Sequence, residues 1–361
     1  MAMIEGIQWF LDRVAEYAFA SFLSWSNFTE ALGRVPQVFT DFSYGLAWPY
    51  LLSSLALAWV IYVFAKRRGR TSATSFREFA FPFRLYGHPS TRLDCRFAAI
   101  DLCFTFLLYV PIMTGVGLLG AKAMSAVLVG LLSWEPPRSL SPMAIIAAAM
   151  GFLILHDFIN YWAHVLFHKV PLLWSFHQVH HSVEVLTPAA AFRIHPVEII
   201  SFAVLQAPAV GLSAVFYENI LGRDQQITMI FGVSIVGFVL ALLGTHLRHS
   251  HIWMSYGPVL NRLFMSPAHH QIHHSIDPRH WNKNFSVKLA VWDALFGTLY
   301  NPGAPETLQV GLPDADPRDF TTVGKLYFRP FRRAIERLRP SIALGAFSRS
   351  RDAMGMRDFK E

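Results

Sequence analysis

The stretch that decides the fold is "PMAIIAAAMGFLILHDFINYWAHVLFHKVP", residues 142–171. Its first part is apolar, and a helix over 142–162 would be about 31 Å long, enough to cross the hydrocarbon core of a bilayer. Its second part carries His164 and His168, which lie four residues apart and therefore share one helix face. Pro171 should end the helix. Histidine is costly near a membrane unless something compensates it.

The composition also indicates a membrane protein. The chain of 361 residues is 53% hydrophobic and only 15% charged, whereas soluble domains carry about 25% charged residues. Its net charge of +7 does not indicate nucleic acid, because the basic residues lie beside apolar segments, where anionic lipid is the expected partner. The N-terminus has no basic n-region and is not expected to be a cleaved signal peptide. Cys95 and Cys103 form neither a disulfide framework nor a zinc motif.

Five apolar segments are candidate membrane spans. They are residues 44–64, 98–119, 142–162, 199–217 and 227–244. Residues 121–134 are too short to span comfortably, and we expect a re-entrant or interfacial piece there.

Basic residues set the expected orientation. The sequence "KRRGR" at 66–70 follows the first span, so that this end should face the cytoplasm. Counting spans from there places two histidine-rich stretches, 164–195 and 246–280, on the same cytoplasmic face. We therefore expect an all-α integral-membrane helical bundle with a cytoplasmic, histidine-rich helical cap.

The two ends of the chain are expected to differ from this core. We expect a single membrane domain over 1–361, with an N-terminal amphipathic segment at 1–43, the spans and histidine-rich core at 44–300, and a basic tail at 301–361. Within the tail, "KLYFRPFRRAIERLRP" from Lys325 is either a basic helix lying on a surface or a solvated tail.

The histidines recur at a fixed spacing. "HQVHH" at 177–181 and "HHQIHH" at 269–274 both contain histidines at i, i+3 and i+4, and on a helix the three of each set should point one way. Eight clustered imidazoles, with His249 as a ninth, are too many for one ion and about right for two. Lone histidines such as His88 and His280 are expected to be surface or packing residues, and His156 to pack or to support a ligand.

Beyond spacing, the sequence resembles the fatty acid hydroxylase / sterol desaturase superfamily of integral-membrane di-iron enzymes. The resemblance covers about residues 140–300 and rests on "HVLFH", "HQVHH" and "HQIHH" together, with "FRIHPVE", "NKNFS" and "WDALFGT" around them. Within the superfamily it is nearest to bacterial sterol-desaturase-like proteins and alkylglycerol monooxygenase. Two departures are Val165, where an arginine is usual, and Ser286, where glycine is frequent.

The resemblance implies a set of site residues. The implied metal ligands are His164, His168, His177, His180, His181, His249, His270, His273 and His274. Asp157 is expected either to orient an imidazole or to bind metal directly, and Tyr161 either to hydrogen-bond near the site or to pack. His195 matches a recurrent position, as a catalytic or a structural residue. Asp293 is expected to cap or pair.

The resemblance further implies the chemistry. Two iron ions would use O2 as co-substrate to hydroxylate or desaturate a lipid, such as a sterol, a fatty acyl chain or an ether or amino lipid. Electrons would come from a separate ferredoxin- or cytochrome-type protein, since no flavin, nicotinamide or haem motif is present. The expected location is a bacterial inner membrane. A membrane zinc hydrolase is the alternative, although no HExxH motif is present; a haem-binding protein and a metal transporter fit less well.

Overall fold

The computed structural model describes residues 12–13, 15–42, 44–133, 141–216, 229–230, 233–313 and 316–338. The chain forms two compact units. The apolar unit comprises Met1–Ala56, Ala99–Asn160 and Ile199–Thr245, and the histidine unit comprises Leu57–Ala98, Tyr161–Glu198 and His246–Glu361. Part of the predicted N-terminal surface segment, residues 1–11, and the end of the basic tail, residues 339–361, lie outside the described residues.

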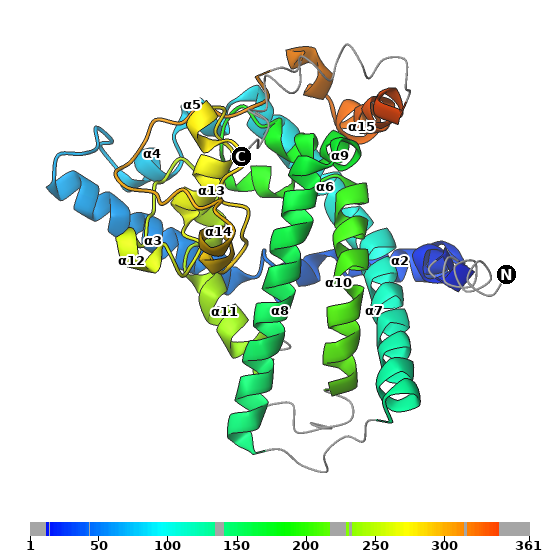
Figure 1. The fold of residues 1–361 in the computed structure, drawn as a ribbon. Coiled ribbons are helices and arrows are strands. Elements are labelled where there is room, and N and C mark those ends of the chain that lie inside the picture. Colours follow the sequence, from blue (N-terminus) through cyan, green and yellow to red (C-terminus); the bar gives the residue numbers. More distant parts are fainter. Residues whose placement is uncertain are drawn as a thin grey trace, which may run out of the picture. The chain divides into compact units, whose positions relative to one another are not determined.

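Four helices of the described chain are long and apolar enough to cross a membrane (Figure 1). They are α3 (Trp48–Arg67), a continuous helix over Pro89–Leu128, α8 (Pro142–Lys169) and α10 (Pro196–Phe216). They overlap the first four predicted spans, and the predicted class, an all-α integral membrane protein, is confirmed. Helix α8 ends at Lys169, shortly before Pro171, as predicted.

The prediction of a separate re-entrant piece at 121–134 is wrong. The second long helix consists of α6 (Pro89–Phe104), the π-helical turn η3 (Thr105–Tyr109), α7 (Val110–Ser125) and the π-helical turn η4 (Ala126–Leu131). Residues 121–131 thus continue the helix that contains the predicted span 98–119. The physical reason is that no proline interrupts this stretch, and a single glycine such as Gly120 costs a helix only about 1 kcal/mol.

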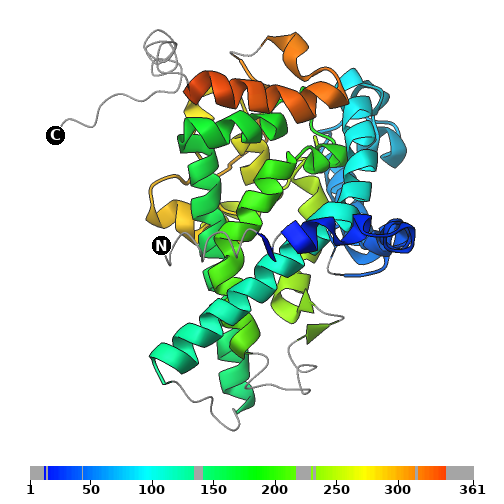
Figure 2. The same ribbon diagram turned by 90° about the vertical axis from the view of Figure 1, so that its right-hand side faces the viewer.

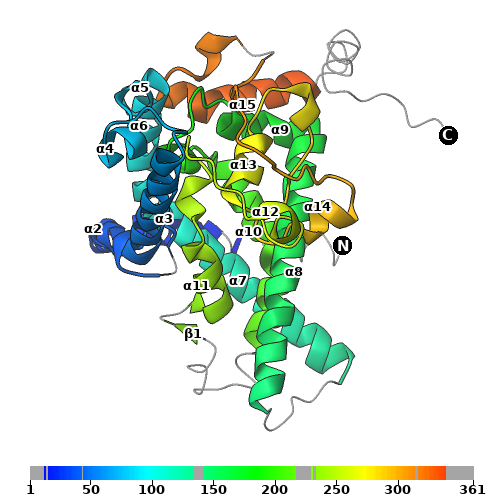
Figure 3. The ribbon, with the colours of Figure 1, turned by 90° about the vertical axis from the view of Figure 1, so that its left-hand side faces the viewer.

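The fifth predicted span, 227–244, is also different in the structure. Its described residues form the strand pair β1 (Met229–Ile230) and β2 (Val233–Ser234), followed by α11 (Ile235–Leu242) (Figure 3). Eight helical residues measure about 12 Å, well short of a bilayer core. The stretch is apolar throughout, but it is rich in β-branched residues, which favour strands over helices.

Within the apolar unit, close backbone contact and polar side chains join the long helices. A Cβ atom on Gly120 of α7 would lie 2.5 Å from the Ala207 carbonyl oxygen of α10, so the two helices pack directly against each other there. Gln206 of α10 donates to the carbonyl of His156 and to the side chain of Asn160, both on α8. The remaining elements are η1 (Ala20–Phe22), α2 (Trp25–Gly33) and η2 (Val35–Phe39).

Besides the ends of α3, α6 and α8, the histidine unit contains shorter helices. After α4 (Phe76–Ala80) and α5 (Phe83–Tyr86) come α9 (Pro171–His181), η5 (Pro188–Phe192), η8 (Thr245–Leu247), α12 (Gly257–Leu260), α13 (Pro267–His273), η9 (Pro278–His280), α14 (Val291–Leu295), η10 (Pro317–Phe320) and α15 (Val323–Leu338). Helix α15 lies along α9, as Figure 2 shows.

Helix α15 shows that the basic C-terminal stretch is not a solvated tail over 323–338. Its residues Leu326, Pro330 and Ala334 recur every four positions and are buried. Leu326 joins a core cluster with Phe97 of α6 and Val179 of α9. The helix therefore holds α9, which carries the "HQVHH" motif, in place.

Candidate metal centre

The nine histidines predicted as metal ligands form two groups within the histidine unit. The five-histidine group consists of His164, His168, His177, His181 and His273, and the four-histidine group consists of His180, His249, His270 and His274. In each group, one nitrogen from every ring lies within 4.8 Å of all the others. Helices α8, α9 and α13 and the turn at His249 bring these residues together from positions up to 110 apart in the chain.

The two HxxHH motifs each supply both groups. In α9, His177 and His181 belong to the five-histidine group, while His180 belongs to the four-histidine group. In α13 the division is reversed, since only His273 joins the five-histidine group. The prediction that all three histidines of a motif point one way is therefore wrong, because neighbouring helical residues are turned by about 100°. Each pair of adjacent histidines ties the two groups together.

Local sequence signals fix the helices that carry these histidines. Pro171 is the first residue of α9, a position that suits proline because it needs no amide donor. Helix α13 starts with Pro267 and has a capping box, in which the Ser266 side chain and the His269 side chain satisfy each other's backbone N–H groups. These caps set the start of each helix and so set where its histidines point.

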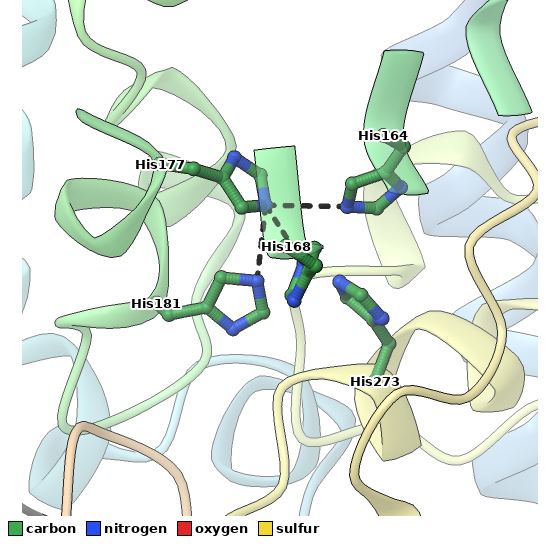
Figure 4. A group of neighbouring side chains, drawn as sticks. All are labelled: His164, His168, His177, His181 and His273. Atoms are coloured by element: carbon green, nitrogen blue, oxygen red, sulfur yellow. Dashed lines mark hydrogen bonds between the residues drawn. The ribbon is translucent and has the colours of Figure 1, made fainter. Parts of the chain in front are cut away.

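In the five-histidine group the ring nitrogens converge around His177 (Figure 4). The Nε2 atom of His177 lies 3.2 Å from that of His164, 3.0 Å from that of His168 and 3.2 Å from that of His181. His273 points its ring at the same place, and its Nε2 atom is buried without a hydrogen-bond partner among the described residues.

The four-histidine group has the same spacing around His249. Its Nε2 atom lies 3.3 Å from that of His180, 3.1 Å from that of His274 and 2.9 Å from that of His270. Nitrogens bound to one metal at about 2.1 Å lie about 3.0–3.4 Å apart, depending on geometry. The spacing in both groups matches such a set.

Three rings of the five-histidine group are anchored through their other nitrogen. The Nδ1 atoms of His164 and His273 lie 2.7 and 2.8 Å from the carbonyl oxygens of Phe285 and Lys283. That of His177 lies 2.8 Å from a carboxylate oxygen of Glu198. A carbonyl or carboxylate oxygen only accepts, so these Nδ1 atoms carry the proton and donate it.

These anchors test whether the group fits a metal ion. In a neutral imidazole with its proton on Nδ1, the Nε2 atom presents a lone pair. His164 and His177 therefore direct two lone pairs at each other across 3.2 Å, which is repulsive unless a cation accepts both. Imidazole nitrogen is a good ligand for iron, copper, zinc or nickel, so the residues present fit a transition-metal ion.

Burial keeps the imidazoles neutral, as metal ligands must be. Burial lowers the pKa of His177 and of His180 to about 3. Burial, reinforced by the neighbouring imidazoles, holds the pKa well below its usual value for the others outside the long apolar helices, namely His181, His249, His270, His273 and His274. At neutral pH these lone pairs are therefore available.

The segment 282–298 is the scaffold for two anchors. Asp293 accepts hydrogen bonds from the backbone N–H groups of Phe285 and Ser286, at 2.9 and 2.8 Å, and from the hydroxyl of Thr298. Asn284 has a φ of 59°, which asparagine tolerates better than most residues. The structure thus explains "NKNFS" and "WDALFGT": of the two predicted roles, Asp293 pairs with this loop and does not cap α14. The fixed backbone directs the Phe285 carbonyl at His164.

A buried ion pair fixes the loop that follows α9. The Arg193 side chain is 1% exposed and lies 2.5 Å from Asp94 of α6. It also donates to the carbonyl and hydroxyl oxygens of Ser182 and Ser90. Because Ser182 follows His181 directly, this network holds the end of the "HQVHH" helix.

The predicted catalytic residues lie outside both groups. Asp157 belongs to the apolar unit and is fully buried. Tyr161 is buried in the histidine unit, and its hydroxyl lies 3.0 Å from that of Thr298. His195 accepts from the Val197 N–H and donates to the Tyr327 carbonyl, so both its ring nitrogens are used by backbone. A catalytic role for these three residues stays a prediction.

Glu198 is the site residue that sequence reasoning missed. It lies in the first turn of α10, buried, with His177 as its hydrogen-bond partner. The only signal was a carboxylate at the start of an otherwise apolar span, three residues after His195, within the motif "FRIHPVE". A single acidic residue forms no sequence pattern from which its imidazole partner could be predicted.

Fold and site together define a class: an all-α membrane protein with two buried histidine clusters that could hold metal ions. Comparison with known proteins agrees, because residues 149–298 match the fatty acid hydroxylase family. The matched residues contain all nine predicted histidine ligands, and the resemblance inferred from the histidine motifs is confirmed.

The chain is also similar to individual enzymes of lipid metabolism. It is 32% identical over 161 residues to ornithine lipid hydroxylase OlsE from Rhizobium tropici, covering 44% of each chain. It is 27% identical to alkylglycerol monooxygenase from Danio rerio over 46% of this chain and 31% of that one, and 27% identical to human cholesterol 25-hydroxylase over 49% and 62%. The matches thus span less than two thirds of each relative. No solved structure matches.

Proposed function

We propose that this protein is an O2-dependent membrane oxidoreductase that holds two iron ions and oxidises a C–H bond of a lipid. The observation that supports this most directly is the pair of imidazole groups, built from the same two HxxHH motifs and directing lone pairs inward. The family match and three relatives named for the oxidation of lipids support the reaction class.

The overall reaction balances with an external reductant. One oxygen atom of O2 enters the C–H bond and the other leaves as water, which consumes two electrons and two protons; desaturation instead removes two hydrogens and releases two waters. Iron, when bound, would supply the activation of O2 and the abstraction of hydrogen. We expect the electrons to come from a separate ferredoxin- or cytochrome-type protein.

The residues of the chain would hold, orient and dry the site. His164, His177 and His273 are each fixed by a hydrogen bond at Nδ1, so their Nε2 atoms stay aimed inward. Phe285 is fully buried and packs its ring 5.0 Å from that of His168, and Trp174 packs 5.4 Å from His181. These aromatic rings exclude water from one side of the five-histidine group.

Metal content and turnover test the proposal together. We expect purified protein to hold two iron ions per chain and, with O2 and a reducing system, to convert a lipid in a membrane extract to a product heavier by one oxygen or lighter by two hydrogens. Lipid profiles of cells with and without the gene would identify the substrate. One zinc per chain, with no activity after iron reconstitution, would instead support a hydrolase.

We further propose that the histidine unit faces the cytoplasm, since Lys66 and Arg67 lie in the last turn of α3 and Arg68 and Arg70 follow it. The test is single-cysteine labelling at Glu184 and Arg279, which are 56% and 67% exposed, in a background without Cys95 and Cys103. Both cysteines should resist a membrane-impermeant reagent in intact cells and react after permeabilisation. Labelling of either one from outside would contradict the orientation.

A further inference from the structure

The two histidine groups differ in how firmly their rings are held. In the five-histidine group, three rings donate through Nδ1 to fixed oxygen atoms. In the four-histidine group, the Nδ1 atoms of His180 and His274 are buried without a hydrogen-bond partner among the described residues. A ring anchored at Nδ1 needs no reorganisation when a metal binds, whereas an unanchored ring must be ordered at that moment.

The groups also differ in charge. Glu198 contacts His177 of the five-histidine group through one carboxylate oxygen, while its other oxygen is buried without a partner in the described part of the chain. A buried carboxylate is costly unless positive charge lies near it. A divalent cation bound to His177 would supply that charge one imidazole away. Neither group contains a carboxylate among its own ligand atoms over the residues described, so Glu198 distinguishes the groups by its hydrogen bond to His177.

We infer that Glu198 makes the two metal sites unequal: the five-histidine group binds its ion first and tightly, and the four-histidine group binds the second ion weakly and exchanges it. This inference rests on the proposed two-metal function. Glu198 acts through His177, as a positioning residue, both by fixing the ring and by adding negative charge behind it. Loss of such a partner typically lowers metal affinity about 10–100-fold.

The experiment is a titration of metal-free, full-length protein in detergent with Co²⁺, followed by its visible absorption and by competition with a chelator. The wild type should bind two ions in two separate steps. His249→Ala removes a ligand from the four-histidine group and should abolish only the weak step. Glu198→Gln keeps a hydrogen-bond acceptor but loses the charge, and should weaken the tight step about 10-fold; Glu198→Leu loses both and should weaken it about 100-fold.

The matched control is Glu184→Gln, which removes an exposed carboxylate elsewhere in the same unit and should leave both steps unchanged. Two ions bound with equal affinity, or loss of the tight step in His249→Ala, would overturn the inference while leaving the proposed function intact. Fewer than two ions bound by the wild type would overturn the proposed function itself. If the Glu198 variants fail to fold, the wild type and His249→Ala still decide the order of binding.

Discussion

The histidine unit and the apolar unit are each stabilised internally by a different kind of contact. In the histidine unit, directed polar contacts dominate: Arg193 pairs with Asp94, and His164 is anchored to the Phe285 carbonyl. In the apolar unit, helices α7 and α10 approach so closely at Gly120 and Gly211 that their backbones touch. Directed polar contacts require particular residues, whereas close packing requires only that side chains be small enough. The first kind should therefore give larger effects when a residue is changed.

The largest effect is expected from the histidines themselves. His177→Ala and His273→Ala each remove a nitrogen from the five-histidine group, and turnover should fall below detection while the protein remains in the membrane. The measurement is product formation, together with metal content per chain. The apolar helices that set insertion are not changed, so membrane fractionation should match that of the wild type.

The control for these variants is His88→Ala. His88 lies outside both histidine groups. Its Nδ1 atom lies 3.9 Å from a carboxylate oxygen of the exposed Glu184. It should behave like the wild type. An inactive His88→Ala beside an active His273→Ala would show that the ligand assignment is wrong.

The contrast between the units also explains what the sequence revealed. Each HxxHH motif repeats at a spacing that chance rarely produces, and the four apolar helices follow from long runs of apolar residues. Residues 227–244 misled the prediction because hydropathy does not distinguish a helix from short strands in a stretch rich in β-branched residues. The anchors of His164 and His273 could not be predicted at all, since they are backbone carbonyls and any residue could supply them.

A smaller loss, in stability, is expected when the buried ion pair is broken. Arg193→Met leaves Asp94 buried without its partner, and removal of one member of a buried pair typically costs about 3–5 kcal/mol. The thermal midpoint in detergent should fall, and metal should be lost at lower temperature because Arg193 also holds Ser182 beside His181. Arg279→Met, at an exposed pair with Asp277, should cost at most about 1 kcal/mol. Equal losses in the two variants would show that the buried Arg193 network does not stabilise the fold.

In the apolar unit the largest effect should come from packing. A Cβ atom on Gly211 would overlap the carbonyl group of Gly120, so Gly211→Ala forces α7 and α10 apart and should cost about 1–3 kcal/mol. The matched control is Gly151→Ala in α8, where no atom lies within 4 Å of the added carbon. That change should be neutral or stabilise by about 0.5–1 kcal/mol, because alanine favours helices over glycine. Denaturation of both variants in the same detergent would show whether their changes in unfolding free energy have opposite signs.

The smallest effect is expected from the polar contacts between α8 and α10. Gln206 accepts from His156 and donates to Asn160, at 2.8 and 2.7 Å. Such contacts between membrane helices average about 0.6 kcal/mol, because the separated helices also find polar partners. A double-mutant cycle with Gln206→Leu and His156→Leu should therefore give a coupling energy below the cost of Gly211→Ala. A coupling of about 3 kcal/mol or more would mean that directed polar contacts, and not close packing, hold the apolar unit together, and the contrast between the two units would no longer stand.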